Sequence, residues 1–254
     1  RVYNVFGISP ELIGIISAAI CLGGFVKGVT GIGLPIVTIA VLTNVLEPLT
    51  TFAILVAPIF VTNLWQAITA KNWKGPLSRF PIMILMLVIC LFIGVQLAIG
   101  LKREVLILVL GISVTIFSAS TLLKPLKHSL SRSTERWLGP LAGAVGGILG
   151  GLTTIWGPPM LMFLILLKLD KETWVQTVGV IWFIGSIPLA FAYWKVGILN
   201  AEIALVSLLA CIPGMVGIWL GETIRYRINP DTFKKILLAT LFVIGLNLIR
   251  RGAF

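Results

Sequence analysis

Eight long apolar segments recur along the chain, separated by short polar connectors. Each is long enough for a helix to cross a bilayer, which takes about 17–25 residues. Their apolar residues lack the strict alternation of a half-buried or barrel strand. We predict helices, since a helix satisfies its own backbone hydrogen bonds in lipid. The segments are 12–46 and 138–167, both interrupted, and 49–70, 80–101, 105–123, 174–194, 203–221 and 233–249.

The composition also favours a bilayer. Hydrophobic residues make up 58% of the chain and charged residues 11%, whereas a soluble domain has roughly 45–50% and about 25%. Too few polar side chains remain to cover an exterior that faces water. We therefore expect an all-α polytopic membrane protein whose surroundings are the lipid bilayer. The first apolar segment lacks the basic lead and cleavage pattern of a signal peptide, so we expect no cleavable one.

Basic residues gather in the connectors. The net charge is +11, which in a soluble protein would suggest a nucleic-acid partner. Here the lysines and arginines lie in short stretches such as KNWKGPLSR at 71–79 and KPLKHSLSRSTER at 124–136. This distribution follows the positive-inside rule, so we expect no nucleic-acid partner and a basic cytoplasmic linker at 124–137.

Glycine and proline interrupt two of the apolar segments. The first interruption is GFVKGVTGIGLP at 24–35, and the second is GGILGGLTTIWGPP at 146–159. Each glycine cluster is followed by proline, and both share a three-residue glycine spacing. The glycines that we match by this spacing are Gly28 and Gly31 in the first cluster and Gly147 and Gly150 in the second.

Further similarities indicate two homologous repeats of four segments each, 1–123 and 138–254. IGVQLAIG at 93–100 corresponds to VGIWLGET at 216–223, and NWK at 72–74 to YWK. If the interrupted segments crossed the membrane, the basic residues would divide almost evenly between its sides. If each is a re-entrant hairpin, one side has a clear excess of them. We therefore expect hairpins, three spanning helices per repeat and an inverted relation between the repeats.

A broken helix at membrane depth needs a reason, because its free N–H and C=O groups are costly in hydrocarbon. The N-terminus of a half-helix presents N–H donors and a partial positive charge, which suit an anion. The alternative is that the glycines only allow tight helix packing. Because two matched clusters both end in proline, we favour a functional break at the bilayer midplane.

The two motifs GFVKGVTGIGLPIVTIAVL and GAVGGILGGLTTIWGPPMLMFLI resemble the paired glycine-rich motifs of the toluene-sulfonate uptake permease family, also called TauE/SafE. The resemblance covers nearly the whole chain, with its two halves and basic linker. It implies transport of sulfur-containing anions such as sulfite or organosulfonates, and a multi-pass protein of a bacterial-type inner membrane. The family differs among its members in solute and direction, so the resemblance selects neither.

Lys27 is the one basic residue well inside an apolar segment, which makes it a candidate anion ligand. It could instead snorkel, or neutralise helix C-terminal carbonyls beside the break. Asn63 and Ser186 occupy matching positions in the two repeats and could line a shared cavity or simply form interhelical hydrogen bonds. The full set of candidate substrate-binding residues is Lys27, Gly28, Thr30, Gly31, Gly33, Asn63, Gly150, Gly151, Thr153, Thr154, Trp156, Gly157 and Ser186.

Other function classes fit less well. All nine carboxylates lie at or near segment ends, so no mid-membrane carboxylate is available for a proton relay or a sodium site. No nucleophile–base pair, metal-ligand cluster or phosphate-binding loop is present in the sequence, and we expect no catalytic residue, no metal and no cofactor. We expect a carrier that exports its anion. A small-anion channel is the alternative, and the oligomeric state, including a homo-oligomer, stays open.

Overall fold

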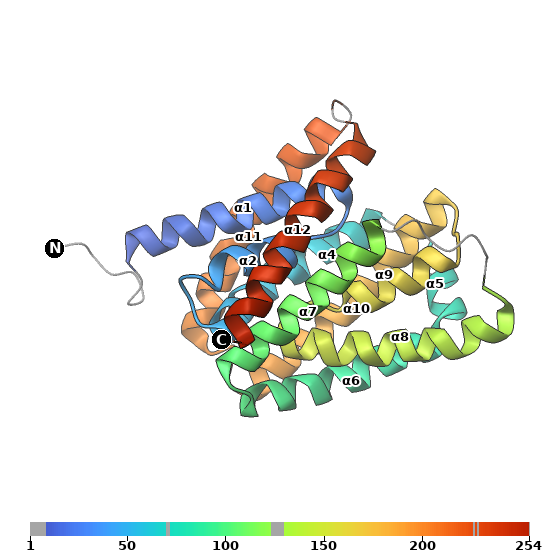
Figure 1. Cartoon of the computed structure of the whole chain (residues 1–254), viewed down its shortest axis with the longest axis horizontal. Helices are drawn as coiled ribbons and strands as arrows, with labels where there is room; N and C mark the ends of the chain where they lie inside the picture. The colour runs from blue at the N-terminus through green and yellow to red at the C-terminus, as the bar shows by residue number, and fades with distance from the viewer. Residues whose placement is uncertain (1–8, 70–71, 123–129, 226, 228, 254) are drawn as a thin grey trace.

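The fold is built from helices (Figure 1). The computed structural model describes residues 9–69, 72–122, 130–225, 227 and 229–253, and these form twelve α-helices and no β-strand. The helices are α1 (Pro10–Thr30), α2 (Leu34–Leu42), α3 (Pro48–Ile54), α4 (Val56–Thr69), α5 (Lys74–Arg79), α6 (Pro81–Gly100), α7 (Arg103–Leu122), α8 (Arg132–Thr153), α9 (Gly157–Leu166), α10 (Lys171–Lys195), α11 (Ala201–Arg225) and α12 (Pro230–Ala253).

The helices agree with the apolar segments of the sequence. Within the described part of the chain, seven spans are long and apolar enough to cross a membrane: α1, the joined α3–α4, α6, α7, α10, α11 and α12. Many side chains on their outer faces are both aliphatic and exposed, such as Ile212 and Val243. An exterior of this kind suits lipid rather than water. The prediction of an all-α multi-pass membrane protein is confirmed.

Three details differ from the expected segments. The segment 49–70 is also interrupted, between α3 and α4, because Pro58 has no N–H to donate to the carbonyl of Ile54 one turn earlier. The basic connector at 71–79 contains the short helix α5, which we did not expect. Of the expected linker 124–137, residues 124–129 lie outside the described residues, and α8 already begins at Arg132.

Both predicted interruptions are present as breaks between helices. After α1, the chain turns back so that α2 lies along α1, where Thr38 Oγ1 donates a hydrogen bond to the Ala19 carbonyl at 3.2 Å. After α8, α9 turns back in the same way, and Gly146 of α8 lies against Met160 of α9. Each break thus joins a long helix to a short one packed on it.

The long helices pack in pairs that join the two halves of the chain. α1 packs along α11, α6 along α8, α7 along α12 and α4 against α10. Glycines allow two of these contacts to be very close: Gly28 lies against Gly221 between α1 and α11, and Gly94 against Gly151 between α6 and α8. The core between the pairs holds buried aliphatic and aromatic side chains such as Leu87. The second break is buried among these residues, whereas residues 30–33 of the first break are half-buried.

Candidate functional site

Lys27 lies in the last turn of α1 and is 8% exposed. Its ammonium Nζ donates hydrogen bonds to Thr62 Oγ1 at 3.0 Å and to Asn63 Oδ1. Both partners are side chains of α4, rather than the terminal carbonyls of α1. Among the described residues no carboxylate forms an ion pair with Lys27. Its charge is therefore balanced only by dipoles, although a buried ion normally needs a counterion.

The Asn63 amide is held in place from both sides. While Oδ1 accepts from Lys27, Nδ2 donates to the Trp182 carbonyl of α10 at 3.2 Å. Asn63 is 1% exposed, so neither bond competes with bulk water. The amide connects α1, α4 and α10 and sets the position of the ammonium.

A small cavity of about 30 Å³ adjoins this group. It has room for one or two water molecules. Five helices and both breaks contribute to its wall. The lining residues are Lys27, Ile32, Gly33, Pro35, Ile36, Ile59, Thr62, Asn63, Thr154, Ile155, Trp156, Gly157, Leu161 and Trp182.

The N-termini of the two short helices meet at this cavity. α2 follows Gly33 and α9 follows Trp156, and neither helix has a side chain that caps its first N–H groups. Prolines in the first turn remove some donors, more in α9, where Pro158 and Pro159 follow one another. Both ends nevertheless direct the positive end of a helix dipole toward the space beside Lys27.

Trp156 adds a further donor. It lines the cavity and is almost fully buried, yet its Nε1 has no hydrogen-bond partner among the described residues. Buried indole N–H groups usually find a partner. The cavity therefore combines an ammonium and two helix N-termini, which favour an anion or a water molecule, with an indole whose N–H is unsatisfied among the described residues.

The two breaks share one hydrogen-bond pattern. The hydroxyls of Thr30 and Thr153 donate to carbonyls one turn earlier at 2.8 and 2.7 Å, and each accepts the N–H two residues later at 3.3 Å. The next residues, Gly31 and Thr154, both adopt left-handed backbone and end their helices. The equivalence of these positions makes Gly150 the counterpart of Lys27.

This register corrects the sequence alignment of the glycines. The spacing paired Gly28 with Gly147, but the hydrogen bonds pair Gly28 with Gly151, one turn later. The spacing misleads because glycines recur at nearly every turn of α8. The corrected register also shows where the breaks differ. In the first break, Lys27 precedes the turn and Gly33 follows it. In the second break, Gly150 precedes the turn and Trp156 follows it.

A second, larger cavity of about 440 Å³ also borders Lys27. It shares Lys27, Ile32 and Thr62 with the small cavity. Its outer wall includes polar and charged residues of the helix ends, among them Glu222 and Arg225 of α11. Lys27 thus borders both a small internal space and a wider, more open one.

The predicted residues fall into three groups. Six line the small cavity: Lys27, Gly33, Asn63, Thr154, Trp156 and Gly157. Gly28, Thr30 and Gly31 line the larger one, which Lys27 also lines. The remaining four line neither cavity: Gly150, Gly151, Thr153 and Ser186.

The four outlying residues have structural contacts instead. Gly151 packs against the backbone of α6, and Gly150 lies against the Trp156 ring. The hydroxyls of Thr153 and Ser186 donate to carbonyls of their own helices at 2.7 and 2.6 Å. For these positions the structure favours packing and local hydrogen bonding.

Sequence reasoning missed two contributors to the site. Thr62 directly precedes Asn63 and binds the same ammonium. A polar pair within an apolar helix was the signal that could have identified it. Trp182 contributes a backbone carbonyl and an apolar wall, and nothing in its sequence context indicates either.

These features define an α-helical membrane protein whose broken helices meet at a buried cationic site, an arrangement typical of membrane transporters. The chain belongs to the sulfite exporter TauE/SafE family, whose family model matches residues 16–248, nearly the whole chain. No curated protein and no solved structure matches it. Membership implies a membrane transporter of the sulfite and sulfonate exporter type.

Proposed function

We propose that the protein exports a small sulfur-containing anion, sulfite or an organosulfonate, which binds beside Lys27 where the two breaks meet. The main support is the buried ammonium, which adjoins a cavity and has no carboxylate counterion within the described part of the chain. An anionic substrate would supply the missing charge. A substrate of the opposite sign would be repelled by the ammonium and by both helix dipoles.

Lys27 dominates the energetics of the proposed site. Two unit charges about 4 Å apart interact by about 4 kcal/mol at an effective dielectric constant near 20. A helix N-terminus adds about 0.3–1 kcal/mol, and up to about 2 kcal/mol where partly buried. The cost of removing the anion from water offsets part of this gain. Removal of the ammonium should therefore weaken binding more than any other single change at the site.

The cavities support alternating access. The small cavity where the breaks meet fits water rather than a sulfonate, so binding there requires the wall formed by the breaks to move. The larger cavity leads to Lys27 from the end of the bundle where α4 and α11 end and α10 begins. The small cavity at the breaks is closed while the larger one beside Lys27 is open, and this difference favours a carrier over a continuous channel.

Helix directions support the re-entrant and inverted topology. α2 and α9 each return along the preceding long helix. Contacts between α4 and α10 are antiparallel, with Asn63 near Trp182 and Gln66 near Gly179. If each break is a re-entrant hairpin, one end of the bundle receives the connectors 71–79, 124–136, 168–171 and 225–235. The positive-inside rule makes this the cytoplasmic end of an inner-membrane protein.

Export is the direction that the physics favours. The larger cavity is reached from the proposed cytoplasmic end. A negative-inside membrane potential drives an anion outward by about 2.3 kcal/mol per charge per 100 mV. Outward transport therefore needs no coupled ion.

The proposal is tested with purified protein in liposomes at a clamped potential. Flux of sulfite, sulfoacetate, taurine, sulfate and chloride is compared for the wild type, Lys27→Met and the control Lys195→Met. Met preserves the apolar stem of Lys27 but removes its charge, and Lys195 is an exposed lysine at the end of α10. We expect saturable, potential-driven flux of a sulfur anion in the wild type and the control, at least tenfold weaker in Lys27→Met.

Two outcomes would contradict the proposal. Unsaturable flux shared by chloride would indicate a channel. Equal sulfur-anion flux in wild type and Lys27→Met would remove Lys27 from the binding site, whatever the solute.

A further inference from the structure

A third cavity lies far from Lys27, where α5 meets α6 and α8 begins. It has a volume of about 830 Å³ and is open to the surface. Arginines and one glutamate line it together with apolar residues at the starts of α6 and α8: Phe80, Pro81, Ile82, Met83, Gly139 and Pro140. Its wall is therefore basic on one side and apolar on the other.

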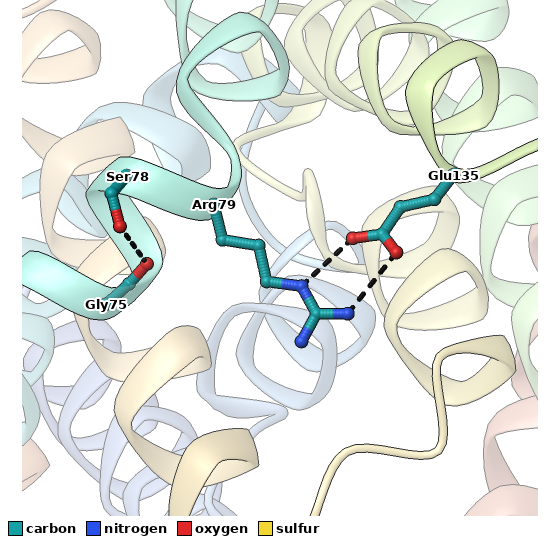
Figure 2. Close-up of polar contacts among 4 residues, drawn as sticks. All are labelled: Gly75, Ser78, Arg79 and Glu135. Atoms are coloured by element: carbon teal, nitrogen blue, oxygen red, sulfur yellow. Dashed lines mark hydrogen bonds and ion pairs between the residues drawn. The ribbon is translucent and has the colours of Figure 1, made fainter. Parts of the chain in front are cut away.

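One ion pair organises the basic side. Arg79 Nε and Nη2 donate to the two carboxylate oxygens of Glu135 at 2.9 and 3.3 Å, as Figure 2 shows. Ser78 Oγ, also in Figure 2, donates to the Gly75 carbonyl within α5 at 3.1 Å and does not compete for the arginine. The Arg79 guanidinium also lies 5.2 Å from the centre of the Phe80 ring. The pair neutralises Arg79 and joins α5 to α8.

Two further arginines leave the cavity with excess positive charge. Arg132 and Arg136 both line it and are exposed. They lie one turn apart on α8, which places them on the same helix face. Neither forms a hydrogen bond or ion pair with another described residue. After the Arg79–Glu135 pair is counted as neutral, two unpaired guanidinium groups remain.

The surroundings are those of a membrane interface. Trp137 directly follows this arginine pair and is 80% exposed, as is typical of residues in an interfacial aromatic belt. Aliphatic side chains near it on the two helices are also exposed: Ile82 and Leu85 of α6, and Leu141 and Val145 of α8. Ile82 also lines the cavity, and α6 and α8 run side by side, so the apolar wall of the cavity opens onto the exposed aliphatic face of α6.

We propose that this cavity binds an anionic phospholipid. The phosphate lies between Arg132 and Arg136, because guanidinium groups bind phosphate oxygens in a bidentate manner. The acyl chains follow the exposed aliphatic side chains of α6, beginning at Ile82 in the cavity wall. Basic pockets between membrane helices on the cytoplasmic side suit such head groups. The lipid would hold α6 against α8, the helix whose far end forms the second break.

The test is a lipid titration of the purified full chain in neutral detergent, with thermal unfolding as the readout. Tetraoleoyl cardiolipin and dioleoyl phosphatidylglycerol are the anionic lipids, dioleoyl phosphatidylcholine is the neutral one, and inorganic phosphate and glycerol 3-phosphate provide the head-group chemistry without chains. We expect the anionic lipids to raise the apparent Tm, while phosphatidylcholine and the soluble phosphates do not.

Variants separate the site from general charge. Arg132→Gln/Arg136→Gln should weaken the apparent lipid affinity about fivefold for each arginine removed. The matched control is Lys74→Gln/Lys235→Gln, which removes two exposed lysines that do not line this cavity. Glu135→Gln should instead strengthen lipid binding, since it frees Arg79 and leaves three unpaired guanidinium groups.

Three results would overturn the proposal. Equal loss of affinity in the arginine pair and in the lysine control would indicate attraction by overall charge. An equal Tm rise with inorganic phosphate would indicate an ion site without a lipid. Weaker lipid binding in Glu135→Gln would show that the ion pair, not the free arginines, forms the site. All three readouts are independent of transport.

Discussion

The substitution Gly151→Ala tests whether this glycine serves helix packing or substrate binding. Gly151 belongs to the predicted binding set, but it lies in the contact between α8 and α6. A Cβ atom there would overlap the Leu91 carbonyl oxygen and lie 2.5 Å from the Val95 nitrogen. These are backbone atoms of a neighbouring helix, so relief requires the helices to move apart.

The size of the effect follows from two opposing terms. Alanine gains about 0.8–1.0 kcal/mol over glycine in a helix interior, and overpacking costs typically 1–3 kcal/mol. Gly14→Ala in α1 is the control, since nothing lies within 4 Å of an added Cβ at that position. The propensity gain is common to both variants, so their difference isolates the clash. Gly151→Ala should be less stable than Gly14→Ala by about 1–3 kcal/mol.

Thermal unfolding in detergent measures the effect on helix packing, and a transport assay in liposomes measures the effect on substrate affinity. For a chain of this size, about 1 kcal/mol corresponds to a Tm change of about 2–4 °C. We expect a lower Tm with unchanged apparent substrate affinity in the protein that remains folded. Equal Tm values for the two variants would refute the packing argument. A weaker affinity at unchanged Tm would place Gly151 in contact with substrate.

Three further predictions concern the breaks, the site and a helix cap. Thr154→Gly should raise the Tm, because a non-glycine residue in left-handed backbone costs about 1–2 kcal/mol; a lower Tm would contradict this. Asn63→Leu removes one partner of the ammonium and should lower the free energy of unfolding by about 1.5–3 kcal/mol. The double variant Lys27→Met/Asn63→Leu should recover most of that loss. No recovery in the double-mutant cycle would contradict the coupling. Hydrogen bonds from the Thr173 side chain and from the Thr173 and Glu172 backbone lower the pKa of Asp170 from 3.8. The carboxylate therefore stabilises the fold above pH 3.8 and loses this effect as the pH falls through its lower folded pKa. Asp170→Ala should accordingly lower the Tm at pH 7 and lower it progressively less in acid. A Tm difference that stays constant with pH would show that the charge has no role.

Much of the fold was accessible from the sequence because membrane helices depend on local properties. An apolar run of sufficient length forms a helix in lipid, and a cluster of glycines followed by proline marks where it breaks. The helices α6, α7 and α10 accordingly begin and end within a few residues of the expected segments. The break of α3 from α4 near Pro58 was missed, and Pro140, Pro188 and Pro213 lie inside continuous helices, so a single proline does not predict a break.

The site was only partly predictable, because local properties indicate single residues but not the contacts between helices. Lys27 and Asn63 could be chosen one by one, since each is a polar residue in an apolar helix. Their mutual hydrogen bond, the role of Thr62 and the carbonyl of Trp182 depend on how α1, α4 and α10 pack.

The sequence by itself therefore determined the membrane class, the helices and the two breaks, because these follow from hydropathy and from the backbone chemistry of glycine and proline. Only the tertiary structure decided the register of the breaks and the separate roles of glycines such as Gly33, at a cavity, and Gly151, in a helix contact. Glycine has no side chain to indicate its neighbours. Its role is set by what approaches it, and that depends on contacts between residues far apart in the chain.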